Sequence, residues 1–331
     1  MKVLFIGGTG NISKSVSKLC VEEGIDLYLL NRDKTEVKIP GTKSIKTDIS
    51  NMKKVTSLLK DHNWDVVVNW INFVENDIKR DIELFRNKTK QYIFISSASV
   101  YQKPPLHPVI TESTPLYNPY WQYSRDKIAC ELLLNRAYQE YDFPITIVRP
   151  SHTYDIILPV AIGGWNRYAV VDRMKKGKKI IVHGDGTSLW VLTHSRDFAK
   201  AFVGLLGNQK AIGNAFHITS DEVLTWNQIY ATIAGAVGVE PNIVHIPSDF
   251  LERIEESLVG NLLGDKAHSV IFDNSKIKTL VPGFTATIPF NQGIKKTLAW
   301  FDEDPKRKVV SDETHKRFEK IIKTYEGNLK S

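Results

Sequence analysis

Three polar side chains in the first half of the chain have the types and spacing of a hydride-transfer site. Tyr123 and Lys127 stand four residues apart in the stretch YSRDK, so a helix places them on one face. A nearby cation lowers the pKa of a phenol from about 10, and the tyrosine can then exchange a proton near neutral pH. Ser97, in the earlier stretch ISSASVY, could hold a substrate hydroxyl or carbonyl. We therefore expect Ser97, Tyr123 and Lys127 to be catalytic.

A glycine-rich turn near the N-terminus supplies a second part of such a site. Gly7 and Gly10 directly follow an apolar run in the stretch GGTGNISKS. Glycines let a strand turn sharply into a helix and let the backbone approach a pyrophosphate, which the helix N-terminus then binds. Ser13 occupies the third glycine position, where a small residue still allows the helix to pack on the strand. The expected coenzyme contacts in this loop are Gly7, Thr9, Gly10, Asn11 and Ile12.

Residues that follow the second and third predicted strands bear on the choice of coenzyme. Asn31 stands where an acidic residue would bind the ribose 2′-hydroxyl of NAD. Arg32 could pair with the 2′-phosphate of NADP, or it is a solvated loop residue. The sequence therefore favours NADP over NAD. Asp48 and Ile49 follow the third strand, and Asp48 either accepts a hydrogen bond from the adenine amino group or caps a helix.

The elements that must position these groups alternate along the first 150 residues. Apolar, β-rich runs are expected as strands at 3–6, 26–30, 44–46, 65–69, 92–96 and 145–148, with helices at 13–23, 52–61, 77–87 and 123–141. This alternation predicts an α/β fold with a doubly wound parallel sheet of the Rossmann type. The rhythm breaks after Pro150, which indicates a smaller C-terminal α+β substrate domain. We expect residues 1–150 and about 192–220 to form the dinucleotide domain, and 151–191 with 221–331 the substrate domain.

Composition narrows the classes of function. The chain has 331 residues, of which 42% are hydrophobic, and a net charge of +7. Apolar runs stay short of a membrane span, and two cysteines make no disulfide framework. Nine histidines lack ligand spacing, so no metal is expected. These features predict a cytoplasmic protein that does not bind membranes. The positive charge suits an anionic coenzyme and substrate, although it also permits nucleic acid.

The order of the motifs resembles one protein superfamily. A glycine turn, a serine cluster at a strand end, Tyr-x-x-x-Lys and then Val148-Arg149-Pro150 are typical of the extended short-chain dehydrogenases/reductases, in their NAD-dependent epimerase/dehydratase group. The resemblance runs from Met1 to about Ile218. It implies a Rossmann domain with a substrate domain, transient oxidation of a sugar that is often nucleotide-linked, and the triad Ser97, Tyr123 and Lys127. It also implies a homodimer formed through the helices at 77–87 and 123–141.

Some positions depart from that pattern and bear on the substrate. Leu189-Trp190 stands where these enzymes carry a diphosphate-binding arginine, which puts a nucleotide-linked substrate in doubt. Ala98-Ser99 replaces the Asp-Glu pair of the dehydratases, so dehydration is disfavoured. His152 replaces an asparagine and is either a substrate contact or a core histidine. Trp190 either stacks on a sugar or packs in the core. The expected substrate contacts are Ser99, His152 and Trp190.

The function expected from these residues is that of an NAD(P)-dependent oxidoreductase or epimerase acting on a sugar or sugar derivative. Tyr123 would take a hydroxyl proton while a hydride passes to the nicotinamide. Two alternatives remain. The sequence is also similar to an atypical branch that includes chloroplast stem-loop-binding proteins, which share the GGTG opening and the stretch SSASVY and bind RNA. The third hypothesis is a regulatory protein that binds NADP without turnover. The complete Tyr-x-x-x-Lys set disfavours both alternatives.

Overall fold

The computed structural model describes residues 1–32 and 37–329. Its centre is a seven-stranded parallel sheet in the order β12-β7-β5-β4-β1-β2-β3. These strands are β1 (Lys2–Ile6), β2 (Asp26–Asn31), β3 (Lys43–Lys46), β4 (Val66–Asn69), β5 (Tyr92–Ile95), β7 (Ile145–Pro150) and β12 (Asn214–Ile218). The order runs outward from β1 in both directions. The topological switch point, where open α/β sheets bind ligands, therefore lies beside β1.

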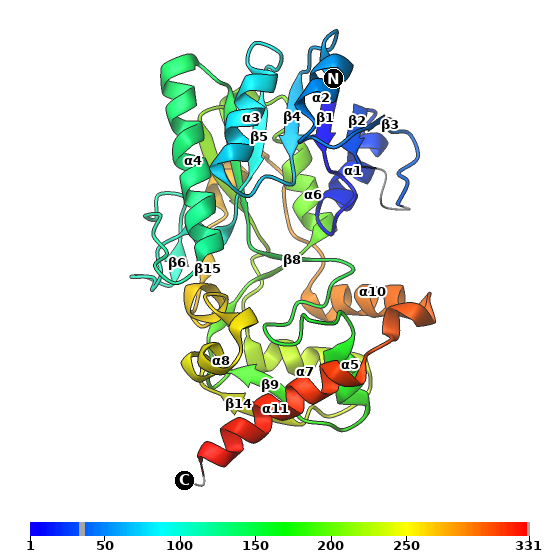
Figure 1. Cartoon of the computed structure of the whole chain (residues 1–331), viewed down its shortest axis with the longest axis vertical. Coiled ribbons are helices and arrows are strands. Elements are labelled where there is room, and N and C mark those ends of the chain that lie inside the picture. The colour runs from blue at the N-terminus through cyan, green and yellow to red at the C-terminus, as the bar shows by residue number, and fades with distance from the viewer. Residues whose placement is uncertain (33–36, 330–331) are drawn as a thin grey trace.

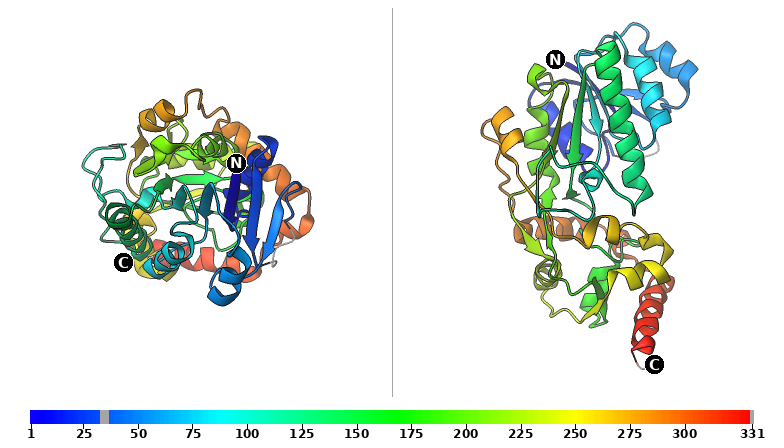
Figure 2. Two further views of the ribbon diagram at one scale, coloured as in Figure 1. Left: turned by 90° about the horizontal axis from the view of Figure 1, so that it is seen from above. Right: turned by 90° about the vertical axis from the view of Figure 1, so that its left-hand side faces the viewer.

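Helices cover both faces of this sheet (Figures 1 and 2). Val3 and Phe5 share one hydrophobic core with α1 and α6, whereas Leu4 and Ile6 share another with α2, α3 and α4. The covering helices are α1 (Ser13–Glu22), α2 (Met52–Leu59), α3 (Glu75–Phe85), α4 (Gln122–Tyr141) and α6 (Ser195–Val203). Strands buried on both faces are apolar without alternation, as the sequence has them. The predicted Rossmann-type α/β fold is confirmed, with small differences at the ends of elements.

A smaller part with its own hydrophobic core lies below the carboxyl ends of the sheet strands (Figure 1). Helices and short strands alternate in it, and two-stranded pairs such as β9 with β14 take the place of a large sheet. Its elements are α5 (Ala169–Lys175), β9 (Ile180–His183), β10 (Leu189–Trp190), β13 (Leu224–Thr225), α7 (Trp226–Ala236), β14 (Ile243–Ile246), α8 (Ser248–Ile254), α10 (Phe290–Asp302) and α11 (Asp312–Asn328).

The chain passes between the two parts more than once. After β7, the short strand β8 (His152–Tyr154) pairs with β11 (Leu192–His194), and the chain then forms α6 and the sheet strand β12. Near its end, β15 (Ile271–Phe272) pairs with β6 (Val109–Ile110), and α9 (Ser275–Leu280) follows. We therefore propose the division given by the sequence, with 1–150 and about 192–220 around the sheet and the other residues in the smaller part.

Two further observations bear on the composition of the chain. Cys20 and Cys130 are both buried free thiols, and burial raises the pKa of each to about 12, so they behave as small apolar core residues. Over residues 1–32 and 37–329, no helix combines the length and apolar character that crossing a bilayer requires.

Candidate active site

A cleft of about 680 Å³ opens where β1, β2 and β4 end. Eight of the residues expected to bind the coenzyme line it: Gly7, Thr9, Gly10, Asn11, Asn31, Arg32, Asp48 and Ile49. Ile12 differs from the expectation, because its side chain packs against the core shared by α1 and α6. The cleft therefore brings the glycine loop and the ends of the second and third strands into one elongated site.

The glycine loop presents bare backbone to this cleft. Gly8 has φ +105°, and a Cβ there would lie 2.7 Å from Leu29 Cδ2, so no larger residue fits. A Cβ added at Gly10 would meet only Ser13 Oγ within 4 Å, at 3.4 Å, and would otherwise project into open space. Helix α1 follows without a side-chain cap at Ile12, and although the Lys14 N–H donates to Gly10 O at 3.0 Å, the positive end of the helix faces this loop and favours an anion. The loop therefore fits the pyrophosphate of a dinucleotide.

Ser13 occupies the position of the missing third glycine and is compatible with the same packing. It is small and buried, and its Oγ accepts a hydrogen bond from the Gly10 N–H at 2.9 Å. The neighbouring Asn11 side chain donates to Thr153 O at 3.0 Å and accepts from Ile156 N–H at 3.2 Å. These contacts fix the loop both to its own helix and to the segment that follows β7.

The far end of the cleft carries the groups that would meet a ribose. In the amide orientation that satisfies its neighbours, Asn31 donates to Gly7 O at 2.8 Å. Arg32 Nη1 lies 3.9 Å from Asp48 Oδ2, and both side chains are exposed, at 59% and 44%. Asp48 Oδ1 also accepts hydrogen bonds from the Ser50 N–H and hydroxyl. An ion pair this exposed contributes at most about 1 kcal/mol, so Arg32 can turn toward a bound anion.

A second cavity, of about 380 Å³, is lined by four of the predicted catalytic and substrate residues, namely Ser97, Ser99, Tyr123 and His152. The buried Lys127 lies outside this lining. Tyr123 does not line the first cleft, but the ring of Phe73, which does, lies 6.4 Å from the Tyr123 ring. The linings of the coenzyme cleft and of this pocket therefore touch at this ring contact, and a transfer between two bound molecules requires such neighbouring sites.

Tyr123 and Lys127, the predicted catalytic tyrosine and lysine, lie one turn apart near the start of α4. Lys127 is buried and donates from Nζ to Asn72 O at 2.5 Å and to Ile95 O at 2.8 Å. Burial lowers its pKa to about 8. Its Nζ lies 5.8 Å from the centre of the Tyr123 ring. Two of the three ammonium donors are thus used by main-chain oxygens, and the ammonium also lies 4.7 Å from the centre of the Phe73 ring, which lines the coenzyme cleft.

The pKa of Tyr123 differs from the expectation. Burial raises it, and this effect exceeds the lowering by the hydrogen bond from Ser97. The nearby Asp265 carboxylate raises it further. The sequence led us to expect that Lys127 would lower this pKa, but in the protein alone the ammonium is directed to main-chain oxygens.

A chain of three hydroxyl groups ends at Ser97. Ser124 Oγ donates to Ser99 Oγ at 2.8 Å, and Ser99 Oγ lies 2.9 Å from Ser97 Oγ. Because the Ser99 hydroxyl accepts from Ser124, its own proton is available to Ser97. Ser97 then keeps its proton for Tyr123 or for a substrate oxygen. Ser99 also lines the pocket, so its contact with a substrate stays a prediction, while its hydroxyl group is placed to position Ser97.

Replacing Ser99 with alanine is expected to lower kcat by about fivefold, because one neutral hydrogen bond contributes about 1 kcal/mol and about 1.4 kcal/mol corresponds to a factor of ten. Coenzyme affinity should stay unchanged. Ser96→Ala is the matched control, because the buried Ser96 Oγ has no hydrogen-bond partner among the described residues. Steady-state kinetics on both variants checks this, and equal losses would contradict the hydroxyl chain.

Trp190 does not line the pocket, which corrects the expectation of a direct substrate contact. It is 2% exposed, its ring packs 5.3 Å from that of Trp226, and its Nε1 donates to His152 Nδ1 at 3.1 Å. Its neighbours on both sides are side chains, so it packs in the core. His152, by contrast, does line the pocket.

Sequence reasoning missed several residues of the site. Trp70, Ile71 and Phe73 line the cleft just after β4, and the rule that ligands sit at strand ends could have found them. Asp265 and Lys266 line the pocket from a π-helical turn (Leu262–Lys266), for which no signal is visible in the sequence. Short π-helical segments often occur at functional sites.

Hydrogen bonds from residues outside the pocket lining fix the position of Lys266. Its carbonyl oxygen accepts hydrogen bonds from Trp226 Nε1 at 3.1 Å and His183 Nε2 at 2.9 Å. Its ammonium donates to Asn261 Oδ1 at 2.5 Å. The position of this positive charge beside the pocket is therefore fixed by the smaller part of the molecule.

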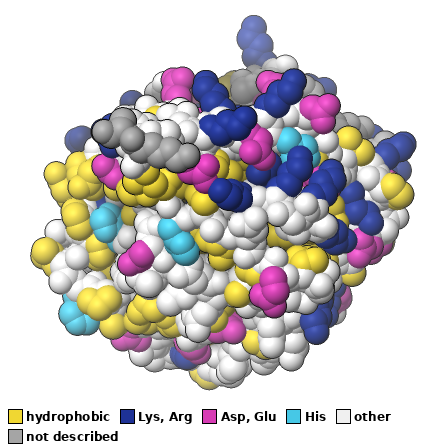
Figure 3. Space-filling view, turned by 90° about the horizontal axis from the view of Figure 1, so that it is seen from below, with side chains coloured by type: hydrophobic (Ala, Val, Ile, Leu, Met, Phe, Trp, Pro, Cys, Tyr) yellow, Lys and Arg dark blue, Asp and Glu magenta, His cyan; other side chains and the backbone are white. Residues whose placement is uncertain are grey.

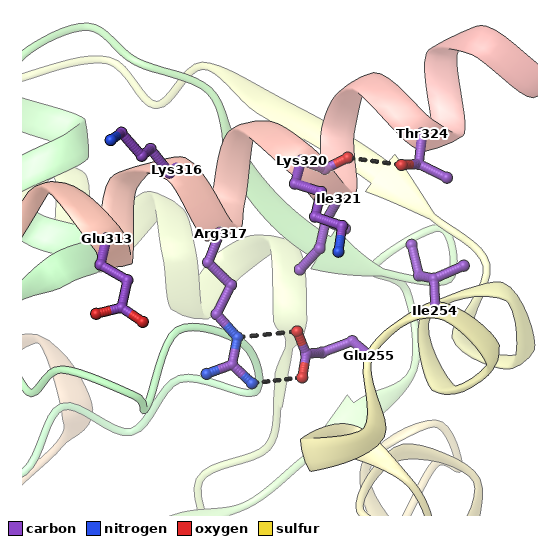
Figure 4. A pocket seen from close by; sticks show the side chains of 8 residues that line it. All are labelled: Ile254, Glu255, Glu313, Lys316, Arg317, Lys320, Ile321 and Thr324. Carbon is purple, nitrogen blue, oxygen red and sulfur yellow. Dashed lines mark hydrogen bonds and ion pairs between the residues drawn. The ribbon is translucent and has the colours of Figure 1, made fainter.

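A different hollow, of about 590 Å³, lies between α11 and the segment after α8 (Figure 4). None of the predicted site residues lines it. Arg317 and Glu255 face each other there and share two hydrogen bonds, so these two charges neutralise each other. The chemistry predicted from the sequence is confined to the cleft and pocket beside the sheet.

Comparison with known proteins agrees with this architecture. Residues 3–219 match the family described as "NAD dependent epimerase/dehydratase family". The chain is 30% identical over 265 residues to the chloroplast stem-loop binding protein of 41 kDa b from Arabidopsis thaliana, covering 75% of this chain and 67% of that protein. It is 23% identical over 292 residues to 2'-dehydrokanamycin reductase from Streptomyces kanamyceticus, covering 86% and 80%.

Solved structures show the same fold. dTDP-glucose 4,6-dehydratase from Bacillus anthracis, solved in complex with NAD, is similar with a TM-score of 0.72 at 19% identity, and the match covers 92% of this chain and 98% of that one. The glycine loop, the parallel sheet and the family match together settle the assignment. The chain is an enzyme of the NAD-dependent epimerase/dehydratase family.

Proposed function

We propose that the protein is an NAD(P)-dependent oxidoreductase or epimerase that acts on a sugar or sugar derivative. The observation that carries the proposal is the place of Tyr123, which lines the pocket and whose ring lies 6.4 Å from that of Phe73 in the lining of the coenzyme cleft. The names of the relatives support a sugar substrate, because they include 2'-dehydrokanamycin reductase and dTDP-glucose 4,6-dehydratase.

Each polar group of the pocket has a role in this reaction. Ser97 donates a hydrogen bond to the substrate oxygen and orients it. Tyr123 takes the proton of the substrate hydroxyl, or returns it to the carbonyl, at its phenolic oxygen. Lys127 holds the ribose next to the ring with its third N–H. The nicotinamide, when bound, supplies the hydride acceptor or donor. Return of the hydride to the other face of the sugar would give an epimer.

NADP is the proposed coenzyme, and Arg32 is the residue that would select it. The exposed guanidinium can pair with a 2′-phosphate by leaving its 3.9 Å contact with Asp48, and the amide of Asn31 carries no negative charge to repel that group. Arg167 lines the same cleft and adds positive charge. Replacing Arg32 with alanine is expected to weaken NADP binding by about 10- to 100-fold, since a hydrogen bond to a charged group contributes about 1.5–3 kcal/mol.

Isothermal titration of the Arg32→Ala variant with NADP and with NAD checks this preference. NAD lacks the 2′-phosphate and serves as the internal control, so its affinity should change little. An equal loss for both coenzymes would assign Arg32 a structural role instead.

RNA binding is the second candidate, and one relative favours it. The Arabidopsis thaliana protein with 30% identity is named for stem-loop binding. Figure 3 shows lysine and arginine side chains gathered on part of the lower face, with aspartate and glutamate among them. Mixed signs of charge weaken the attraction to a phosphate backbone, so this candidate ranks below the enzyme activity.

Mass spectrometry of the ligands released from protein purified at low salt separates the two candidates. Retained NAD or NADP at close to one equivalent, with no RNA, is the result expected for the enzyme. Ribonucleotides without any nicotinamide coenzyme would overturn the enzyme proposal and favour the second candidate.

Assembly and location remain proposals. We propose a cytoplasmic homodimer that pairs α3 and α4 of two copies. Leu132 on α4 supports this interface, because it is a large apolar side chain that is 61% exposed.

A further inference from the structure

The substrate pocket is lined by a histidine, His152, whose tautomer is determined by a hydrogen bond from a buried tryptophan. His152 begins β8 and lines the pocket, while Trp190 lies buried behind it on β10. Trp190 Nε1 lies 3.1 Å from His152 Nδ1. An indole N–H can only donate a hydrogen bond, so Nδ1 has to accept it with its lone pair. The imidazole proton must then be on Nε2.

The same contact keeps the ring neutral. A protonated imidazole carries a hydrogen on both nitrogens, and a hydrogen on Nδ1 would point at the indole N–H. Burial acts in the same direction, as does the positive charge of Lys266, and together they lower the pKa of His152 to about 3. The surroundings therefore favour one protonation state and one tautomer.

The Nε2 atom of His152 faces the pocket, because Nδ1 is occupied by Trp190. Nδ1 faces Trp190, which lies outside the pocket lining. Within the described part of the chain, no side chain or main-chain group forms a hydrogen bond with Nε2. This atom is also absent from the set of fully buried side-chain atoms without a partner, so Nε2 is accessible. The Nε2–H group thus meets the space that Ser97 and Tyr123 also line.

We propose that Trp190 is a positioning residue that holds His152 as the Nε2–H tautomer and makes it a fixed hydrogen-bond donor that selects an acceptor oxygen on the substrate. The selection of a substrate oxygen rests on the proposed function of this pocket; the tautomer does not. A substrate with a carbonyl, ether, carboxylate or phosphate oxygen at this point gains a hydrogen bond. A group that can only donate leaves the buried donor unpaired and is rejected.

The test is nitrogen NMR of protein whose histidine rings carry ¹⁵N. A His152→Gln variant removes one set of resonances and assigns them. In the wild type, we expect Nδ1 of His152 to resonate as an unprotonated nitrogen and Nε2 as a protonated one, unchanged from about pH 5 to about pH 8. A protonated Nδ1, a mixture of tautomers, or titration in this range would overturn the proposal.

Two tryptophan variants separate positioning from packing. Trp190→Phe keeps an aromatic ring but removes the N–H donor, so both tautomers should become populated. Trp226→Phe is the matched control. Its ring also lies near His152, at 6.1 Å, but its Nε1 donates to Lys266 O and not to the histidine. It should leave the tautomer unchanged. Equal effects of the two variants, or an unaltered tautomer in Trp190→Phe, would show that Trp190 only packs.

This readout needs neither coenzyme nor turnover. If the protein binds no nicotinamide coenzyme but His152 is held as Nε2–H, the proposed function fails and the tautomer assignment stands. If the tautomer differs while the coenzyme binds, only the present inference fails.

Discussion

Replacing Tyr123 with phenylalanine is expected to lower the rate of hydride transfer by about 10²- to 10⁴-fold, the usual contribution of a positioned general acid or base. Tyr123 lines the smaller pocket, and its ring contacts Phe73, which lines the coenzyme cleft, as well as Trp121 and Lys127. Phenylalanine keeps those ring contacts and removes only the hydroxyl group. Affinity for the coenzyme should therefore remain within a few-fold of the wild type.

A single-turnover measurement checks this prediction, because reduction of bound coenzyme is visible by absorbance even when an epimerase shows no net oxidation. Tyr120→Phe makes the same substitution three residues earlier, at a side chain that is 40% exposed, and should leave the rate unchanged. A Tyr123→Phe enzyme with wild-type rates would exclude the phenol as the proton-transferring group.

Replacing Glu131 with alanine is expected to lower the free energy of unfolding by about 3–5 kcal/mol, because it leaves a buried guanidinium without its partner. Arg149 donates to Glu131 from Nε at 3.0 Å and from Nη2 at 2.6 Å, and their side chains are 5% and 0% exposed. This pair joins α4, which carries Tyr123, to the end of β7. Its loss therefore also loosens the support of the catalytic helix.

Urea denaturation followed by circular dichroism measures the effect. Glu140→Ala on the same helix is the control, because its ion pair with Arg136 is exposed and screened by solvent, so its loss should change the stability little. If both variants lost the same small amount, the buried pair would contribute no more than a surface pair.

The sheet and the glycine loop could be predicted because local sequence determines them. β4 reads Val-Val-Val-Asn and is buried throughout, so burial on both faces leaves a continuous apolar run. The loop requires glycine, as the φ of Gly8 and the tight space around it show. Tyr123 and Lys127 share a face because the helix repeat alone places them there.

The other half of the pocket could not be predicted, because it depends on contacts between distant segments. Lys266 belongs to a π-helical turn without any periodic pattern, and contacts with Trp226 and His183 hold its carbonyl group in place beside the pocket. Whether Trp190 stacks on a ligand or packs in the core depends on the neighbours on its two sides, which a sequence does not reveal. The same holds for the pKa of Tyr123, which follows burial more than it follows the nearby lysine.

The bridge made by Asn11 has an evolutionary consequence. Its amide bonds only to main-chain atoms, the carbonyl of Thr153 and the N–H of Ile156. Any sequence that follows the same backbone path after β7 offers these two atoms. Side chains of the smaller part can therefore change during evolution, or be exchanged in a recombinant chimera, while these two hydrogen bonds to the glycine loop are kept.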